Sequence, residues 1–319
     1  MKGLLKSKSP GSQLLLFICI ALVSFFLISG MIGPIIVGLI TGVSLKDFEA
    51  IAKGNITTPT SINFIRGLNF CQFIGLFVIP SFICARLFGT DSFQYLGLKK
   101  PNSNLYFIAG IVALIIAIPL VTFLGELNKS VQFPHGAVEN WMKKSEAEAA
   151  KTVQALLSQH TVKDLILNII FVALLAGIGE ELFFRGMLQR LFIKMFKNPW
   201  PGIIIAAFLF SAMHLQFYGF LPRFALGILL GVVYWYSGSL WTAILAHFVY
   251  DALLITLVYF NPSMMNEDNP MPEANNMALV GTISFVMVVL LIEWMRRKST
   301  VRYDEVYADD KIPYKDNPF

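Results

Sequence analysis

Charged residues are scarce in this sequence: Asp, Glu, Lys and Arg make up only 14% of its 319 residues, while hydrophobic residues make up 56%. An ordinary soluble domain carries roughly a quarter charged residues. The few charges cluster in the tails and short loops, between apolar runs of about 20 residues, long enough to cross a hydrocarbon core of roughly 30 Å. Lipid offers the backbone no hydrogen-bond partner, so such runs must be helices. The composition predicts an all-α, polytopic membrane protein.

Cysteine is also scarce, with three residues in the whole chain. Cys19, Cys71 and Cys84 all lie inside apolar runs, with neither metal-ligand spacing nor the loop positions of a disulfide framework. The net charge is +5, but the basic residues flank the apolar runs, which indicates membrane orientation. We therefore expect membrane lipid as a partner and no nucleic acid.

We predict about eight membrane spans. They lie at residues 13–38, 64–87, 105–125, 165–185, 202–216, 223–237, 241–259 and 277–295. Basic residues precede the first span and follow the last, so the positive-inside rule places both termini in the cytoplasm and requires an even number of crossings. We expect residues 1–319 to form a single integral membrane domain, in the plasma (inner) membrane of a bacterium.

Two regions outside the spans have distinct compositions. Residues 126–164 mix acidic residues and lysines, and are expected to form an outer loop with an amphipathic helix around Glu139–Leu157, lying against the bilayer. The segment with Glu267, Asp268 and Glu273 is also expected on the outside. Residues 300–319 are polar and are expected to form a flexible cytoplasmic tail.

Ionisable residues inside the predicted spans are few and clustered. A charge at the bilayer centre costs at least about 2.5 kcal/mol on insertion scales, so such residues usually face the bundle interior and have a function. Three clusters lie in the second half of the chain, on spans four, five and seven. They are Glu180-Glu181-x-x-x-Arg185, Phe210-x-x-x-His214 and His247-x-x-x-Asp251.

Helical spacing suggests how these clusters are arranged. Glu181 and Arg185 are four residues apart and can form an ion pair on one face of a helix. Glu180 is rotated by about 100° from Glu181, which leaves its carboxylate free for chemistry. His247 and Asp251 are also four apart, so the aspartate can orient the imidazole or share a substrate contact. Glu180 is expected near the cytoplasmic end of span four, in a site open towards the cytoplasmic leaflet.

Each cluster also has a purely structural interpretation. An acidic pair followed by arginine is common at helix ends, a single histidine in an apolar helix usually packs, and a His–Asp pair is often a structural hydrogen bond. The coincidence of two acids and two histidines on three neighbouring spans favours a site. Arg66, Asn69 and Gln72 form a weaker polar patch on span two, which we interpret as helix-packing contacts. We assign no role to His135 and His160.

A glutamate with two histidines suits the activation of water. Glu180 would accept a proton from water, His214 would help position that water, and His247 with Asp251 would stabilise an oxyanion on a peptide carbonyl. Glu180, His214 and His247 are also a possible ligand set for a single zinc ion. The residues alone leave both routes open.

The ordered set of three motifs resembles the CPBP family (CAAX proteases and bacteriocin-processing enzymes, also called Abi). The strings EELFFRGMLQ and GILLGVVYWYSGSLWTAILAH are similar to it as well. The resemblance covers residues 165–259, the expected catalytic core. It implies an eight-helix intramembrane endopeptidase related to the CAAX prenyl endopeptidase, with its active site between helices four, five and seven.

The resemblance also implies roles for individual residues. Glu180 corresponds to the general base, His214 to the histidine that shares the water, and His247 with Asp251 to the oxyanion site. The last motif often ends in asparagine, a neutral donor, whereas Asp251 must be protonated to donate; an orienting role towards His247 is therefore favoured. Members are named metalloproteases, but we favour a metal-free, glutamate-activated water with no cofactor.

The sequence thus predicts an intramembrane endopeptidase that hydrolyses a peptide bond of a membrane-associated protein or peptide. One alternative is a non-catalytic membrane scaffold or bacteriocin-immunity protein that keeps the fold. Another is a proton-coupled transporter, since buried acids and histidines also form proton relays; it predicts inverted repeats, and the sequence has none. Prenylation of the substrate and the oligomeric state leave no mark in the sequence.

Overall fold

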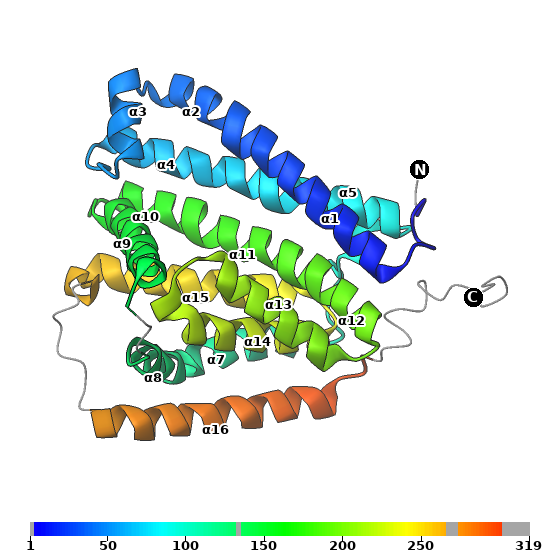
Figure 1. Cartoon of the computed structure of the whole chain (residues 1–319). Helices are drawn as coiled ribbons and strands as arrows, with labels where there is room; N and C mark the ends of the chain where they lie inside the picture. Colours follow the sequence, from blue (N-terminus) through cyan, green and yellow to red (C-terminus); the bar gives the residue numbers. More distant parts are fainter. Residues whose placement is uncertain (1–2, 132–134, 266–273, 302–319) are drawn as a thin grey trace.

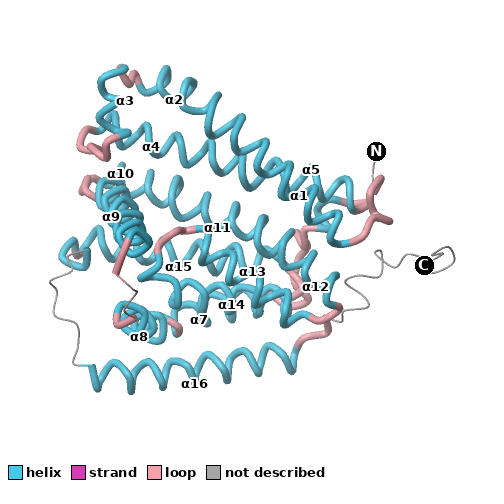
Figure 2. The backbone as a smooth tube through the Cα atoms, in the orientation of Figure 1, coloured by secondary structure: helices cyan, strands magenta, loops and turns pink. Residues whose placement is uncertain are grey.

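The computed structural model of the protein describes residues 3–131, 135–265 and 274–301. Helix is the only regular secondary structure in these residues, which confirms the all-α prediction (Figure 2). The acidic segment predicted on the outside and the tail beyond residue 301 fall outside the described residues.

The long helical segments follow the expected spans, and several contain π-helical turns or a bend. They are α1–η1–α2 (Pro10–Thr41), α4–η2–α5 (Pro59–Phe88), α7 and α8 (Leu105–Ile116 and Ile118–Lys129), α10–η3–α11–η4–α12 (Val162–Phe196), α13 (Pro199–Met213), α14 (Phe220–Ser237), α15 (Leu240–Phe260) and α16 (Ala274–Lys298). Successive segments run in opposite directions across the bundle, so that α1 begins and α16 ends at the same end of it (Figure 1).

The number of full-length spans differs from the prediction of eight. In the described residues six segments are long and apolar enough to cross a membrane, and a seventh counts if α7 and α8, bent by 40°, form one broken span. The remaining predicted span, 202–216, is α13. Its 15 residues cover about 22 Å at 1.5 Å per residue, less than a hydrocarbon core of roughly 30 Å. This predicted span is shorter than expected because the helix ends within the bundle, where Leu215 adopts a left-handed φ of 53°.

Capping residues and prolines explain where several helices begin and end. Ser9, Thr58 and Asn198 accept hydrogen bonds from the first-turn amides of α1, α4 and α13, and each is followed by a proline. Proline suits this position because its missing N–H has no partner in the first turn. The left-handed residues Gly42 and Gly238 end α2 and α14, with φ of 72° and 66°.

The helices pack around α10–α12, which carries the central part of the site. The hairpin of α1–α2 and α4–α5 lies on one side of this segment, and α13, α14, α15 and α7 lie on the other (Figure 1). The peripheral α16 runs along α7 and α8. Aromatic rings fill the contact between α1, η2 (Phe73–Val78) and the centre: Phe183 packs against Phe17 at 4.8 Å and against Phe77 at 5.8 Å between ring centroids.

The helix α9 (Ala137–Leu157) crosses the end of the bundle opposite to the start of α1 (Figure 1). It contacts α4, α10 and α15, and it covers the connection between α13 and α14. There Trp141 packs against Phe217 at 5.2 Å, and a Glu146 carboxylate oxygen accepts a hydrogen bond from the Tyr218 amide at 3.3 Å. The segment predicted to be an amphipathic surface helix therefore closes one end of the bundle.

Arg66 ties α4 to α10, as expected for a packing contact. Its guanidinium is 3% exposed, donates to Asp164 at 2.9 Å, and donates twice to the side-chain oxygen of Asn168. Asn168 in turn donates to the Leu156 carbonyl at the end of α9. This network fixes which face of α4 is turned towards the centre of the bundle.

Gly202 permits the close approach of α13 to α12 (Arg190–Phe196), and we predict that Gly202→Ala destabilises the protein. A Cβ at this position would lie 2.8 Å from the backbone nitrogen of Ile193 and 2.4 Å from its Cγ1. Overpacking of this kind costs about 1–3 kcal/mol, so the apparent Tm of the purified protein in detergent should fall.

Gly125→Ala in α8 is the matched control, because nothing lies within 4 Å of its Cβ position. Alanine favours a helix by about 1 kcal/mol over glycine, so the Tm of this variant should stay the same or rise. Equal Tm values for the two variants would contradict the close approach at Gly202.

Candidate active site

Glu181 and Arg185 form an ion pair that is fully enclosed by protein. Both lie on the π-helical segment η4 (Glu181–Gln189), and their side chains are 0% and 1% exposed. Arg185 Nη1 donates to Glu181 Oε1 at 2.7 Å, and Nη2 donates to the Gly227 carbonyl at 2.9 Å. The guanidinium also lies 4.7 Å from the ring centroid of Phe210. Every partner of this arginine belongs to the protein, so the pair acts as a structural tie between η4, α13 and α14.

His247 on α15 is oriented by the same carboxylate. Its Nδ1–H donates to Glu181 Oε1 at 2.9 Å, and the ring is buried. The opposite nitrogen, Nε2, lies 3.4 Å from Asp251 Oδ2 and 4.0 Å from Glu180 Oε2. The sequence suggested Asp251 as the orienting group, whereas the structure gives the shorter contact to Glu181.

His214 caps the end of α13 and faces Glu180 from the other side. Its Nδ1–H donates to the Phe210 carbonyl at 2.8 Å, which leaves Nε2 with its lone pair directed at the site. This Nε2 lies 4.0 Å from Glu180 Oε1. The Phe210 ring packs near both imidazoles, at centroid distances of 5.1 Å to His214 and 6.1 Å to His247.

Glu180 ends α11 (Leu175–Glu180) and places its carboxylate between the two histidines. Each carboxylate oxygen is 4.0 Å from one Nε2, too long for a direct hydrogen bond. A water oxygen placed about 2.8 Å from both Glu180 Oε1 and His214 Nε2 could hydrogen-bond to both, with an Oε1–water–Nε2 angle of about 90°. Glu180 also lines a cavity of about 190 Å³, enough for several waters at roughly 30 Å³ each. Among the described residues this carboxylate accepts no hydrogen bond, so it is free to bind water.

The structure brings all the residues singled out from the sequence into one cluster between α11–η4, α13 and α15, the predicted spans four, five and seven. They are Glu180, Glu181, Arg185, His214, His247 and Asp251. Their depth differs from the prediction. Glu180 lies near the middle of Val162–Phe196, not near its end, because the charge of Arg185 is neutralised internally by Glu181 and does not mark the end of the span.

The backbone at the site also departs from the regular α-helix that we assumed. Residues Glu181–Gln189 are π-helical, as are Ile169–Leu174 one short helix earlier. π-Helical turns are rare and often occur at functional sites, where they change the direction of the side chains that follow. Here the helix changes from α to π between Glu180 and Glu181, whose carboxylates have different surroundings.

Sequence analysis missed two residues that share the cavity with Glu180. Asn69 and Gln72 on α4 line it, together with apolar side chains of η2 (Phe73–Val78) and η3 (Ile169–Leu174). We interpreted them with Arg66 as packing contacts, but only Arg66 has that role. The available signal was their spacing: residues three apart lie on one helix face, and two amides on one face of a membrane span are costly without partners.

The donor set does not fit a zinc ion in this arrangement. Tetrahedral zinc with bonds of about 2.0–2.2 Å brings neighbouring ligand atoms to about 3.3–3.5 Å from one another. The histidine nitrogens are 4.0 Å from the Glu180 oxygens. In the part of the chain that the structure describes, no group of three or more His, Cys, Asp or Glu side chains could hold a metal ion. We therefore derive no step through a metal.

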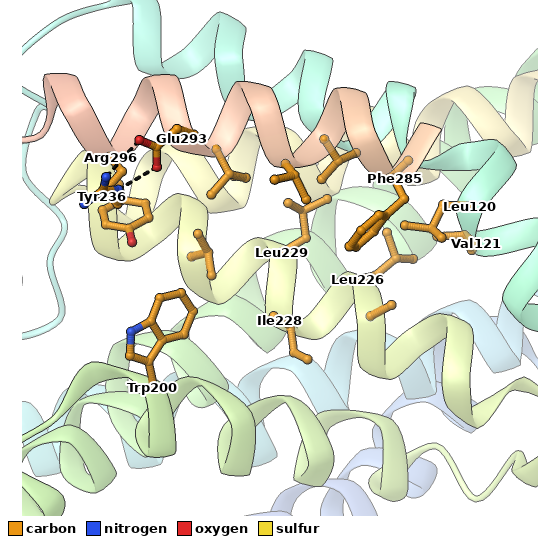
Figure 3. A pocket seen from close by; sticks show the side chains of 16 residues that line it. Leu120, Val121, Trp200, Leu226, Ile228, Leu229, Tyr236, Phe285, Glu293 and Arg296 are labelled. Carbon is orange, nitrogen blue, oxygen red and sulfur yellow. Dashed lines mark hydrogen bonds and ion pairs between the residues drawn. The ribbon is translucent and has the colours of Figure 1, made fainter. Parts of the chain in front are cut away.

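Two larger cavities lie away from the cluster, and none of the six site residues lines them. One, of about 440 Å³, lies between α14 and α16 and is almost wholly apolar, with the Glu293–Arg296 ion pair at one end (Figure 3). The other, of about 650 Å³, lies between α2, α4 and α10, with Phe171 in its wall. Phe171 also lines the cavity at Glu180. Apolar grooves on a membrane protein suit lipid chains, and lipid as a partner stays a prediction.

The fold and the site define an all-α polytopic membrane protein with a carboxylate–histidine cluster at its centre. Residues 162–253 match the family model described as type II CAAX prenyl endopeptidase Rce1-like. Over this part of the chain, the match confirms the resemblance to the CPBP/CAAX protease family that was drawn from the three motifs.

Two curated bacterial proteins are similar to part of the chain. One is "Uncharacterized protein YpbD" of Bacillus subtilis (strain 168), 32% identical over 97 residues, or 29% of this chain and 47% of that protein. The other is "Uncharacterized 24.3 kDa protein" of Escherichia coli, 30% identical over 96 residues, or 29% of this chain and 44% of that protein. The chain thus spans just under half the length of these relatives. No solved structure matches the chain.

We predict that Arg185→Met strongly destabilises the protein. Removing one partner of a buried ion pair leaves the other charge uncompensated, at a cost of about 3–5 kcal/mol. The apparent Tm in detergent should therefore fall sharply, and Arg297→Met is the control. Arg297 pairs with Glu293 on an exposed surface, its side chain 75% exposed, and such pairs contribute little. A Tm loss as small as that of the control would show that Arg185 does not hold a buried charge.

Proposed function

We propose that this protein is an intramembrane endopeptidase in which Glu180 activates the attacking water. The observation that carries this proposal is the contrast between the two neighbouring acids. Glu181 is occupied by Arg185 and His247, whereas Glu180 faces two imidazole nitrogens at 4.0 Å and keeps its oxygens available. The match of residues 162–253 to the CAAX prenyl endopeptidase family model supports the same reaction class.

The first step places water between Glu180 Oε1 and His214 Nε2. His214 accepts a hydrogen bond from this water, because its Nδ1–H is already donated to the Phe210 carbonyl. Glu180 takes a proton from the water, and the resulting hydroxide adds to the carbonyl carbon of the scissile peptide. A carboxylate that is mostly buried, lines a cavity and accepts no hydrogen bond from the described residues is suited to this role.

The second step stabilises and then collapses the tetrahedral intermediate. His247 as an imidazolium has protons on both nitrogens: Nδ1–H stays on Glu181, and Nε2–H is left to donate to the oxyanion. Asp251, 3.4 Å from Nε2, keeps the ring positively charged and oriented. Glu180 then returns its proton to the leaving amine, the C–N bond breaks, and one water has been consumed per peptide bond.

The substrate class is a peptide or the membrane end of a membrane-associated protein. The site lies inside a bundle with apolar walls, so a substrate has to reach it from the membrane or from its surface. We place the protein in a bacterial plasma membrane with both termini in the cytoplasm. The basic residues at the two ends of the chain and the bacterial source of both relatives support this placement.

Comparison of wild type with Glu180→Gln tests the proposal. Mass spectrometry of membranes from expressing cells would identify peptides with new termini that form with wild type. We expect these peptides to disappear with Glu180→Gln, because an amide cannot accept the proton, and to persist with the control Glu148→Gln. Glu148 lies on α9 and its side chain is 67% exposed. Identical sets of peptides from wild type and Glu180→Gln would favour the scaffold alternative.

The metal-free route makes a separate prediction. Purified protein treated with a strong chelator, then freed of it, should keep its Glu180-dependent cleavage within about twofold, because the proposed steps use only protein groups and water. Loss of activity that returns on addition of zinc would overturn the metal-free mechanism while leaving the peptidase assignment intact.

A further inference from the structure

The cavity at Glu180 has a second polar wall, formed by α4. Asn69 and Gln72 line this cavity together with Glu180, and Phe73, Phe77 and Phe171 add apolar rings to its wall. Its volume is about 190 Å³. A cavity with a carboxylate on one side and two amides on the other differs from the apolar grooves elsewhere in the bundle.

The position of these amides is fixed by contacts on both helices. The buried network of Arg66 holds α4 against α10, and Asn69 follows about one turn further along the same helix. Gly179 lets α11 approach η2, since a Cβ there would lie 2.6 Å from Phe77 Cδ2 and 2.9 Å from Phe73 Cδ2. The face of α4 that carries Asn69 and Gln72 is therefore held close to Glu180.

Neither amide is used inside the protein. Among the described residues, the side chains of Asn69 and Gln72 form no hydrogen bond, whereas Asn63, Asn128 and Asn168 all do. Asn69 is half-buried and Gln72 is exposed, whereas an amide in a membrane span usually bonds to a neighbouring helix. Two such amides beside a candidate general base point to a partner that arrives from outside the chain.

The chemistry of the amide identifies that partner. An Asn or Gln side chain carries both a donor N–H₂ and an acceptor C=O, the same two groups as a peptide unit. A substrate segment extended through this cavity would bring peptide groups that have left water or a helix and need partners. Side-chain amides can satisfy them whatever the substrate sequence.

We propose that Asn69 and Gln72 are substrate-binding residues that hydrogen-bond the backbone of the peptide beside the scissile bond. This inference rests on the proposed peptidase function and adds a second wall to its site. It assigns to α4 the placement of the peptide carbonyl over the water at Glu180. Because the recognition is to backbone, it predicts tolerance of different side chains near the scissile bond.

The first test compares Asn69→Leu and Gln72→Met with the control Asn276→Leu, an exposed amide on α16. Glu180-dependent peptides in expressing membranes would be quantified for each. We expect about a tenfold loss of cleavage per lost hydrogen bond with the two cavity variants, and none with the control. The apparent Tm of the cavity variants should stay the same or rise, because each removes an unpaired amide from the bundle; a structural role would lower it.

The second test uses the substrate itself. A synthetic peptide copying a cleaved sequence would be made with single N-methyl groups at the residues around the scissile bond, each removing one backbone donor. At the critical position, wild type should lose about tenfold in kcat/KM. In Asn69→Leu or Gln72→Met, the same N-methyl group should lower kcat/KM by less than a further twofold, because the hydrogen bond to the amide is already missing.

The outcomes separate this inference from the function on which it rests. If no cleavage depends on Glu180, the peptidase function fails and the inference fails with it. If cleavage depends on Glu180 but is unchanged in both cavity variants, only the role of the amides is overturned. The same conclusion follows if N-methylation lowers kcat/KM as much in the cavity variants as in wild type.

Discussion

The buried ion pair between Glu181 and Arg185 is the contact on which the arrangement of the site depends. Taking two charges out of water is costly, and the attraction between them repays that cost only with good geometry and further hydrogen bonds. Arg185 reaches across to the Gly227 carbonyl of α14 and lies against the Phe210 ring of α13, while the Glu181 oxygen that binds it also holds His247 of α15. One charge pair thus fixes three helices around a common centre.

This arrangement explains why two adjacent acids have different roles. Glu181 is bound by Arg185 and orients His247, whereas Glu180, one residue earlier, accepts no hydrogen bond from the described residues. The proposed mechanism uses this free carboxylate to bind water. The boundary between α11 and the π-helical η4 falls between them. His247 is then aligned through its Nδ1, so that its Nε2, not its other nitrogen, faces Glu180 and Asp251. Buried charges orient the side chains of the site. Such charge interactions are strong because the protein interior excludes water.

Much of this could be predicted from residue patterns, and the failures have physical causes. The apolar runs and the spacing of Glu181 with Arg185 and of His247 with Asp251 are local signals, and they predicted the spans and the cluster. The shortness of α13 depends on a single left-handed residue, Leu215, which carries no strong sequence signal because it is not glycine. The depth of Glu180 was predicted wrongly because a basic residue such as Arg185 usually marks the end of a span, and the sequence does not show that Glu181 neutralises it. The link from Glu181 to His247, and the nearness of Asn69 and Gln72 to Glu180, join residues far apart in the chain, so no periodicity reveals them.

The central claim is that Glu180 and His214 hold a water molecule between them. A crystal structure of the protein in a lipid phase, at a resolution that shows ordered water, tests it most directly. The account predicts density for one water within hydrogen-bond distance of both Glu180 Oε1 and His214 Nε2, with His247 still bonded to Glu181. A metal ion bound by Glu180 and both histidines, or a Glu180 carboxylate bonded directly to Arg185, would contradict it.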